Sequence, residues 1–166
     1  RDREYLARQR GYELRTVKAA IEVNRDQKIR LFKKAADRLI TFAGLKVAVL
    51  GLTFKPGPDD LREAPSLENI PLLLNAGAEI YAYDPVGEEN FKKKIPEGIH
   101  YARTPQEALE DAGVCFIFTE WDEIRAVTPL EYKELMKIPL VYDGRNIYGV
   151  EAMRAAGVEY YSIGRA

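Results

Sequence analysis

The chain has 166 residues, a net charge of −1 and a charged fraction of 31%. This length suits one α/β domain with an additional element, and a domain of that size buries roughly 70% of its unfolded surface. No basic block suggests a nucleic-acid partner, and no apolar stretch approaches the roughly 20 residues of a membrane-spanning helix. The single cysteine, Cys115, permits no internal disulfide, which fits a reducing, cytoplasmic location.

The first element is a long helix. Residues 13–42 contain neither glycine nor proline, which predicts one helix of about 30 residues, or about 45 Å, from Glu13 to Phe42. One apolar stripe consists of Leu14, Val17, Ile21, Asn24, Leu31 and Ala35. A second apolar stripe consists of Ile29, Phe32, Ala36 and Ile40. A helix with two apolar faces packs against two neighbours. We expect these to be the sheet on one side and a second subunit or a further domain on the other.

Two details of this region carry their own interpretations. Asn24 interrupts the first stripe and is either a polar residue that sets the register of a helix seam or a ligand contact. The seam interpretation is favoured. The chain begins in the middle of a charged helical pattern at Arg1, which favours a fragment of a longer protein.

Beyond Gly44, short apolar runs alternate with helical stretches. We expect strands at Val47–Leu50, Glu79–Tyr83, Val114–Phe118, Leu140–Tyr142 and Val158–Ser162. We expect helices at Leu67–Asn75, Phe91–Ile95, Thr104 to about Asp111, Pro129–Met136 and Val150–Ala156. This alternation is typical of a parallel sheet between two layers of helices. The predicted fold is α/β: a three-layer, Rossmann-like parallel sheet of about five to six strands, preceded by a long α-helix. Residues 1–44 form the helical region and residues 45–166 the domain.

Polar loops follow three of the predicted strands. They are Lys55–Arg62, Thr119–Asp122 and Asp143–Asn146. Ligands of open α/β sheets bind beyond the carboxyl ends of the strands, where these loops lie. The cations among them are Lys55, Arg62 and Arg145. Arginine holds a diphosphate bidentately and lysine acts as a compact charge, so the loops form a candidate anion site.

Each of these residues also has an ordinary structural interpretation. Lys55 and Arg62 could pair on the surface with the nearby carboxylates of residues 59, 60 and 63. Phe54 and Trp121 could wall a base or a sugar, or could simply pack. The dinucleotide fingerprint G-x-G-x-x-G is absent after the first strand, so the loop cannot be assumed to wrap a pyrophosphate with its backbone.

Other residues with chemical potential are assigned structural roles. Asp84 is either a turn residue before Pro85, which is favoured, or a ribose ligand as in dinucleotide-binding folds. Cys115 lies inside a predicted strand and is expected to be inert core. His100 lies away from the polar loops, and no histidine or cysteine cluster has the spacing of a metal site. No Ser-His-Asp or Cys-His pair is present, so no residue is assigned a catalytic role.

Four motifs, in this order and spacing, resemble those of one enzyme family. They are EVNRDQK at Glu22–Lys28, GLTFKPGPDDLREAPS at Gly51–Ser66, FTEWDE at Phe118–Glu123 and YDGRNIY at Tyr142–Tyr148. Together they span nearly the whole chain, and they resemble the UDP-glucose/GDP-mannose dehydrogenase family. The resemblance covers the central helix and the C-terminal, UDP-sugar-binding domain of that family, in a form similar to its bacterial and archaeal UDP-glucose members.

The resemblance implies roles for individual residues. Lys55 would contact the substrate, with Phe54 beside it and Arg145 near it, and Arg62 would reach NAD. Some members of the family carry a second arginine where this chain has Asn146, so no contact is assigned to that position. A homodimer would form through the long helix.

The implied reaction oxidises the C6 alcohol of a nucleotide sugar to a carboxylate with two NAD, through a thioester on a cysteine. That cysteine belongs to a motif that this chain lacks, so the resemblance implies that the chain alone is inactive. UDP-glucose is the expected substrate, with GDP-mannose and UDP-N-acetylmannosamine as alternatives. A different class of function is a non-catalytic module that binds a nucleotide sugar or holds a dimer together.

Overall fold

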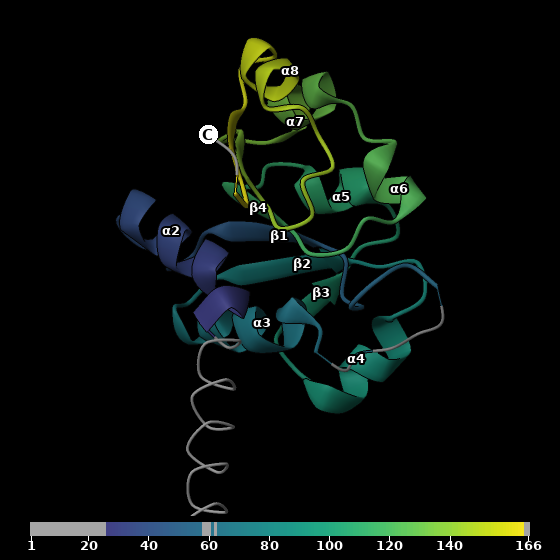
Figure 1. Ribbon diagram of the computed structural model, residues 1–166. Coiled ribbons are helices and arrows are strands. Elements are labelled where there is room, and N and C mark those ends of the chain that lie inside the picture. Colours follow the sequence, from purple (N-terminus) through teal and green to yellow (C-terminus); the bar gives the residue numbers. More distant parts are fainter. Residues whose placement is uncertain (1–25, 58–60, 62, 165–166) are drawn as a thin grey trace, which may run out of the picture.

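The computed structural model describes residues 26–57, 61 and 63–164, which form a six-stranded sheet covered by helices on both faces (Figure 1). The strands are β1 (Lys46–Leu50), β2 (Glu79–Tyr83), β3 (Ile99–Tyr101), β4 (Val114–Ile117), β5 (Leu140–Asp143) and β6 (Glu159–Ser162). The helices are α2 (Arg30–Arg38), α3 (Pro65–Asn75), α4 (Glu88–Lys94), α5 (Pro105–Leu109), α6 (Asp122–Arg125), α7 (Pro129–Leu135) and α8 (Val150–Ala155). The predicted Rossmann-like α/β fold is confirmed.

The strand order creates one switch point in the sheet, where the chain changes the side on which it adds strands. All neighbouring strands are parallel, and their order is β3-β2-β1-β4-β5-β6. The chain therefore builds the sheet outward from β1 in one direction and then returns to β4 on its other side. Ligands of open α/β sheets bind in the crevice at such a switch point, beyond the carboxyl ends of the two central strands. Here those strands are β1 and β4.

Alternate residues of the central strands feed two separate cores. Val47 and Val49 of β1 are fully buried in the core that the sheet shares with α2, α3 and α4. Ala48 and Leu50 are fully buried in the core on the opposite face, against α5, α7 and α8. Because successive side chains of a strand point to opposite faces, a strand between two helical layers is apolar throughout. This is the origin of the continuous apolar run that predicted β1.

The predicted long helix is wrong in its end point. Helix α2 ends at Arg38, and Leu39 has extended dihedral angles of φ −96° and ψ 144°. Phe42, predicted to be helical, is instead buried in the core and stacks on Phe32 with 5.5 Å between ring centroids. The chain leaves the helix after Arg38 because Phe42 packs against Phe32 of α2 and against the core. Ile29 also departs from regular helix, between helical residues 26–28 and α2.

Only part of the two predicted apolar stripes can be compared with the structure. Leu31 and Ala35 of the first stripe are buried against the sheet, as expected. In the second stripe Phe32 is half-buried, but Ala36 is exposed and Ile40 lies beyond the helix and is fully exposed. Residues 13–25, including Asn24, lie outside the described residues. A dimer through this region stays a prediction.

One strand and one short helix were missed. Strand β3 has three residues at the edge of the sheet, and its His100 is exposed while stacking on Tyr81 at 4.5 Å between ring centroids. A strand so short, with a polar centre, carries no apolar run and no alternation that could distinguish it from a loop. Helix α6 is a single turn directly after the polar Thr119–Trp121 segment, where the sequence predicted only loop.

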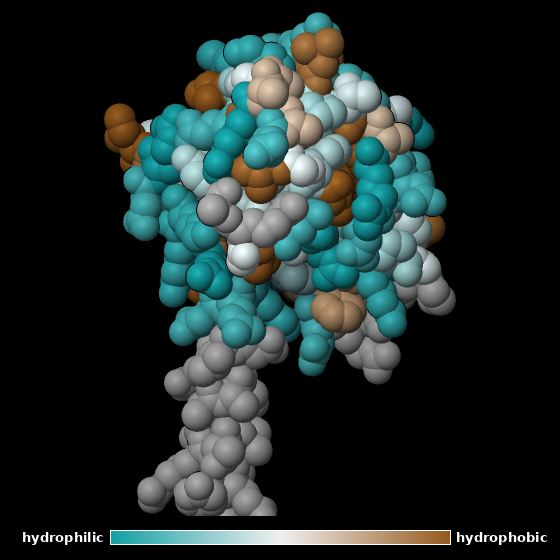
Figure 2. All heavy atoms as spheres, turned by 45° about the horizontal axis from the view of Figure 1, so that its top comes forward, coloured by the Kyte–Doolittle hydropathy of each residue, from teal (hydrophilic) through white to brown (hydrophobic). Residues whose placement is uncertain are grey.

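Hydrophobic residues on the displayed surface occur singly. Figure 2 shows them scattered between hydrophilic residues on the face that it displays. The large hydrophobic residues that are exposed come from separate places in the fold: Ile40, Val86, Leu130, Ile138 and Ile163. Isolated exposed hydrophobic residues are normal for a protein surface. None of the helices in the described ranges combines the length and the apolar character that crossing a membrane requires.

Candidate functional site

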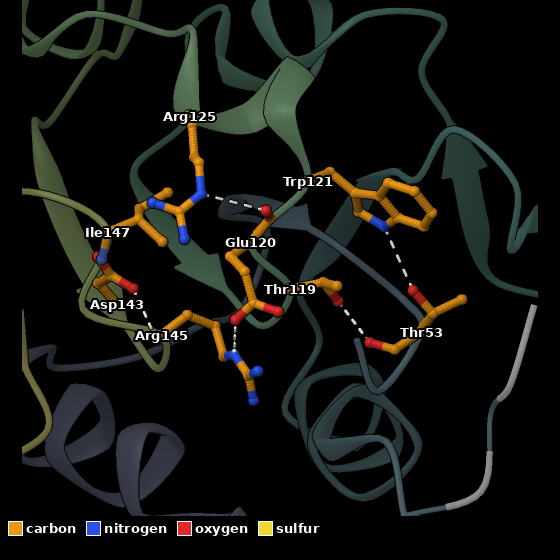
Figure 3. A network of polar contacts seen from close by, with 8 residues as sticks. All are labelled: Thr53, Thr119, Glu120, Trp121, Arg125, Asp143, Arg145 and Ile147. Carbon is orange, nitrogen blue, oxygen red and sulfur yellow. Dashed lines mark hydrogen bonds and ion pairs between the residues drawn. The ribbon is translucent and has the colours of Figure 1, made fainter. Parts of the chain in front are cut away.

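The loops that follow β1, β4 and β5 meet at the carboxyl edge of the sheet (Figure 3). Gly51 begins the first loop with φ +97°, a conformation that favours glycine. Its lack of a side chain lets this loop approach the loop after β4, since a Cβ on Gly51 would lie 2.5 Å from Cβ of Thr119. Thr119 Oγ1 donates a hydrogen bond to the carbonyl oxygen of Thr53. This contact joins the two loops across the switch point of the sheet.

The carboxylate of Asp84, at the end of β2, holds the first loop in place. Its Oδ2 accepts hydrogen bonds from the backbone N–H of Leu52 at 2.7 Å and of Thr53 at 3.2 Å. The same oxygen accepts from Thr53 Oγ1 at 3.3 Å and from the indole Nε1 of Trp121 at 3.0 Å. Asp84 is only 8% exposed. One buried carboxylate therefore connects the ends of β1, β2 and β4.

The second oxygen of Asp84 forms the turn that the sequence predicted. Oδ1 accepts from the backbone N–H of Val86 at 2.9 Å and of Gly87 at 2.7 Å. A carboxylate has about four lone-pair positions, and six donors within the chain already surround this one. Asp84 therefore has no free capacity for a ribose hydroxyl, which was the alternative interpretation.

The loop after β5 is built on another buried carboxylate. Asp143 is fully buried, and its Oδ1 accepts the backbone N–H of Arg145 at 2.8 Å. Its Oδ2 accepts from the backbone N–H of Ile147 at 2.8 Å and from the hydroxyl of Tyr160 at 2.6 Å. Asn146 has a left-handed conformation with φ +55°. Its side-chain amide donates a hydrogen bond to the backbone carbonyl of residue 163 and accepts one from the backbone N–H of the same residue. These contacts fix the backbone from which the Arg145 side chain extends.

The structure brings two of the sequence-predicted site residues together. The guanidinium carbon of Arg145 lies 5.9 Å from the centroid of the Phe54 ring, at the outer limit of a cation–π contact. Arg145 Nε donates to the carboxylate of Glu120, which follows Thr119 after β4. The side chains of Arg145 and Glu120 are 28% and 20% exposed. A cation and an aromatic ring from two different loops thus lie side by side at the surface.

The two other predicted cations have a different status. Lys55 is exposed, next to Phe54, and its ammonium forms no ion pair or hydrogen bond with another described residue. In particular it forms none with Glu63, one of the carboxylates proposed as its surface partners. Arg62 lies outside the described residues, as do residues 59 and 60, so the predicted NAD contact of Arg62 stays a prediction.

Two hollows lie near the loops at the carboxyl edge of the sheet. A cavity of about 50 Å³ lies between α2 and Arg145, with room for water but not for a nucleotide. A larger hollow of about 410 Å³ opens at the carboxyl ends of β2 and β3, between Tyr83, Tyr101 and Arg103. Among the described residues, no three histidine, cysteine, aspartate or glutamate side chains gather where they could hold a metal ion.

Cys115 has the environment that the sequence predicted. It lies in the middle of β4 and is fully buried. Burial raises the pKa of its thiol well above the usual range, and the negative charge of Asp143 raises that pKa further. The nucleophilic form of a cysteine is the thiolate, so this environment suits a packing role.

Comparison with known proteins assigns the family. The profile described as "UDP-glucose/GDP-mannose dehydrogenase family, UDP binding domain" matches residues 48–150, which is more than half of the chain. The chain belongs to this family. The matched range contains the loops after β1, β4 and β5, and with them Phe54, Lys55, Glu120 and Arg145.

The most similar proteins agree with this assignment. A UDP-glucose 6-dehydrogenase of Bacillus subtilis (strain 168) is 40% identical over 93% of this chain and 35% of its own length. One of Rhizobium meliloti (strain 1021) is 42% identical over 92% of this chain and 35% of its own length. The solved structure of a UDP-glucose dehydrogenase from the archaeon Pyrobaculum islandicum superposes with a TM-score of 0.74, at 31% identity, covering 90% of this chain and 32% of its own. The chain spans about a third of the length of these relatives of the UDP-glucose/GDP-mannose dehydrogenase family.

Two neighbours of the candidate site, Thr119 and Glu120, were not assigned roles from the sequence. Trp121 was considered only as a wall for a base or a sugar, or as a packing residue, whereas its indole donates hydrogen bonds to Asp84 and Thr53. Nothing in the sequence showed that this polar loop joins the loops of Thr53 and Arg145. The available signal was the position of this motif directly after a buried strand, which predicts the edge of the sheet but not the contacts made there.

Proposed function

We propose that this chain is the nucleotide-sugar-binding part of an NAD-dependent UDP-glucose 6-dehydrogenase, which oxidises UDP-glucose to UDP-glucuronate with two NAD. The observation that carries the proposal is the Arg145–Phe54 contact at the switch point of the sheet, beside the exposed Lys55. It is supported by membership of the UDP-glucose/GDP-mannose dehydrogenase family and by the names of the most similar relatives.

The charges at this edge suit a diphosphate. Arg145 supplies a planar fork of N–H donors, which matches two oxygens of a phosphate group, and Lys55 supplies a compact charge. Phe54 precedes Lys55 in the same loop and offers a flat apolar face to a sugar or a base. The backbones of these loops are anchored by Asp84 and Asp143, so little backbone entropy is lost when a ligand binds.

The remaining parts of the proposal concern the wider enzyme. Arg62 contacts NAD, and residues 1–44 form a homodimer contact next to the nucleotide-sugar-binding domain at 45–166. UDP-N-acetylmannosamine and GDP-mannose are the alternative substrates. Titration with each nucleotide sugar separates these possibilities, since the proposal requires UDP-glucose to bind more tightly than GDP-mannose.

Calorimetric titration of the purified chain with UDP tests the two cations. Lys55→Ala and Arg145→Ala are each expected to weaken UDP binding by about 1.5–3 kcal/mol, the range for hydrogen bonds to charged groups, which is about 10- to 150-fold. Lys137→Ala is the matched control, because Lys137 is also exposed but precedes β5 at the opposite edge of the sheet. Unchanged UDP affinity in both site variants at the same ionic strength would remove this surface from the proposal.

Cys115 is not expected to act as the nucleophile of the oxidation. A thioester intermediate requires a thiolate within reach of the substrate, whereas this thiol is fully buried and its pKa is raised. The purified chain should produce no NADH from UDP-glucose and NAD, and a thiol reagent should label Cys115 only after unfolding. Sustained turnover that disappears in Cys115→Ala would contradict this expectation.

A further inference from the structure

Glu120 contacts only one edge of the Arg145 guanidinium group, and this matters for ligand binding. The atom of Arg145 that Glu120 holds is Nε, on the side edge of the guanidinium. Figure 3 shows the terminal nitrogens of Arg145 pointing away from Glu120. Within the described part of the chain, no hydrogen bond occupies these terminal nitrogens. Four of the five guanidinium N–H donors, in the arrangement that grips a phosphate bidentately, therefore remain available.

The residues before and after Glu120 are both fixed by hydrogen bonds. Thr119 before it is bonded to the carbonyl oxygen of Thr53, and the indole of Trp121 after it donates to Asp84 at 3.0 Å. The backbone carbonyl of Glu120 also accepts Nε of Arg125 at 3.3 Å. The carboxylate therefore starts from a fixed backbone, and it can restrict a long arginine side chain that would otherwise populate many rotamers.

We propose that Glu120 is a positioning residue, which holds Nε of Arg145 so that the terminal amino groups face the diphosphate of the nucleotide sugar. This inference rests on the proposed function, because it assumes that Arg145 contacts the diphosphate. Glu120 itself does not touch the ligand. It acts by reducing the number of orientations that Arg145 must give up when the ligand binds.

The negative charge of Glu120 has an opposite effect that makes the role testable. A carboxylate beside the site repels a diphosphate, so a purely electrostatic role would make every neutral replacement bind UDP more tightly. A positioning role needs only an acceptor for Nε, which the side-chain oxygen of glutamine supplies without charge. The two roles thus predict different orders of affinity for alanine and glutamine at this position.

The experiment is calorimetric titration with UDP at fixed ionic strength, with circular dichroism to verify the fold of each variant. Glu120→Ala is expected to weaken binding about tenfold, whereas Glu120→Gln binds as tightly as the wild type or more tightly. In the Arg145→Ala background, Glu120→Ala is expected not to weaken binding further, because only the repulsion of the diphosphate remains to be removed. Rescue by glutamine combined with loss of the effect without Arg145 is a result that general destabilisation does not produce.

Three outcomes overturn the inference or its basis. Tighter binding in both Glu120→Ala and Glu120→Gln shows a repulsive charge and no positioning. Wild-type affinity in Glu120→Ala, while Arg145→Ala binds more weakly, refutes the role of Glu120 and leaves the proposed function intact. Wild-type affinity in Arg145→Ala refutes the assignment of Arg145 in the proposed function itself.

A second variant keeps the test decisive if Glu120→Ala does not fold. Arg145→Lys retains the charge but has a single ammonium group, which cannot bind Glu120 on one edge and phosphate on another. It is expected to bind UDP several-fold more weakly than the wild type, and Glu120→Gln added to it should recover part of the affinity. Wild-type affinity in Arg145→Lys would overturn the inference.

Discussion

Replacing Asp84 by alanine is expected to lower the free energy of unfolding by at least about 3 kcal/mol. The reason is that six donors lose their acceptor together, four of them on Oδ2 and two on Oδ1. A buried donor without a partner costs about 1–3 kcal/mol, and water entering the space left by the carboxylate would satisfy only some of them. The loop that carries Phe54 and Lys55 would lose the three hydrogen bonds that Leu52 and Thr53 donate to Asp84, so UDP binding should weaken as well.

The conservative variant separates hydrogen bonding from side-chain volume. Asp84→Asn keeps the shape of the side chain, but its amide nitrogen cannot accept hydrogen bonds and must replace either Oδ1 or Oδ2. The free energy of unfolding is therefore expected to fall by about 2–4 kcal/mol. Urea unfolding measures both variants, with Glu134→Gln as a control that removes one exposed carboxylate on α7. If Asp84→Asn were as stable as this control, the carboxylate would not be the connection between the loops.

Asp84 also illustrates why fold and site differ in how far they could be predicted. The turn that it forms with residues 86 and 87 is local, and the pair Asp84-Pro85 predicted it. The bond from Trp121 to Asp84 spans 37 positions and the bond from Arg145 to Glu120 spans 25. Such contacts depend on which strands are neighbours in the sheet, and alternation of strands and helices predicts a parallel sheet without its strand order.

The elements that were predicted correctly are those with a strong local pattern. Strands β1 and β4 are buried on both faces and therefore appear as continuous apolar runs. The exit of Phe42 from the expected helix has no such pattern, because phenylalanine suits an apolar helix face as well as a core position. Its place was decided by packing against Phe32 and the sheet.

The place of the predicted site residues followed from the sheet, whereas their roles followed from the family resemblance. Phe54, Lys55 and Arg145 lie in loops that follow buried strands, and parallel strands bring their carboxyl ends to one edge. The structure brings Phe54 and Arg145 into contact and leaves Lys55, the next residue after Phe54, exposed. The acceptor that holds Arg145 could not be chosen from the sequence, because several other carboxylates occur in the same loops.

A second large effect is expected from Gly51→Ala, which should lower the free energy of unfolding by about 2–5 kcal/mol. Two costs combine at this position. The left-handed φ of +97° costs a residue with a Cβ about 1–2 kcal/mol, and forcing extra atoms into a packed space costs about 1–3 kcal/mol. The added Cβ would lie 2.5 Å from Cβ and Oγ1 of Thr119 and 2.6 Å from its backbone nitrogen.

A control glycine with a positive φ but open space around it separates the steric overlap from the backbone cost. Gly44 has φ +71°, but a Cβ added there would have nothing within 4 Å, so Gly44→Ala should cost only about 1–2 kcal/mol. Thermal unfolding compares the two, and for a domain of this size each kcal/mol lowers Tm by about 2–4 °C. Adding Thr119→Ala to Gly51→Ala should not restore stability, because the backbone nitrogen of residue 119 remains in the way. Equal Tm values for Gly51→Ala and Gly44→Ala would show that the loops after β1 and β4 can move apart without cost, and the candidate site would then have no rigid base.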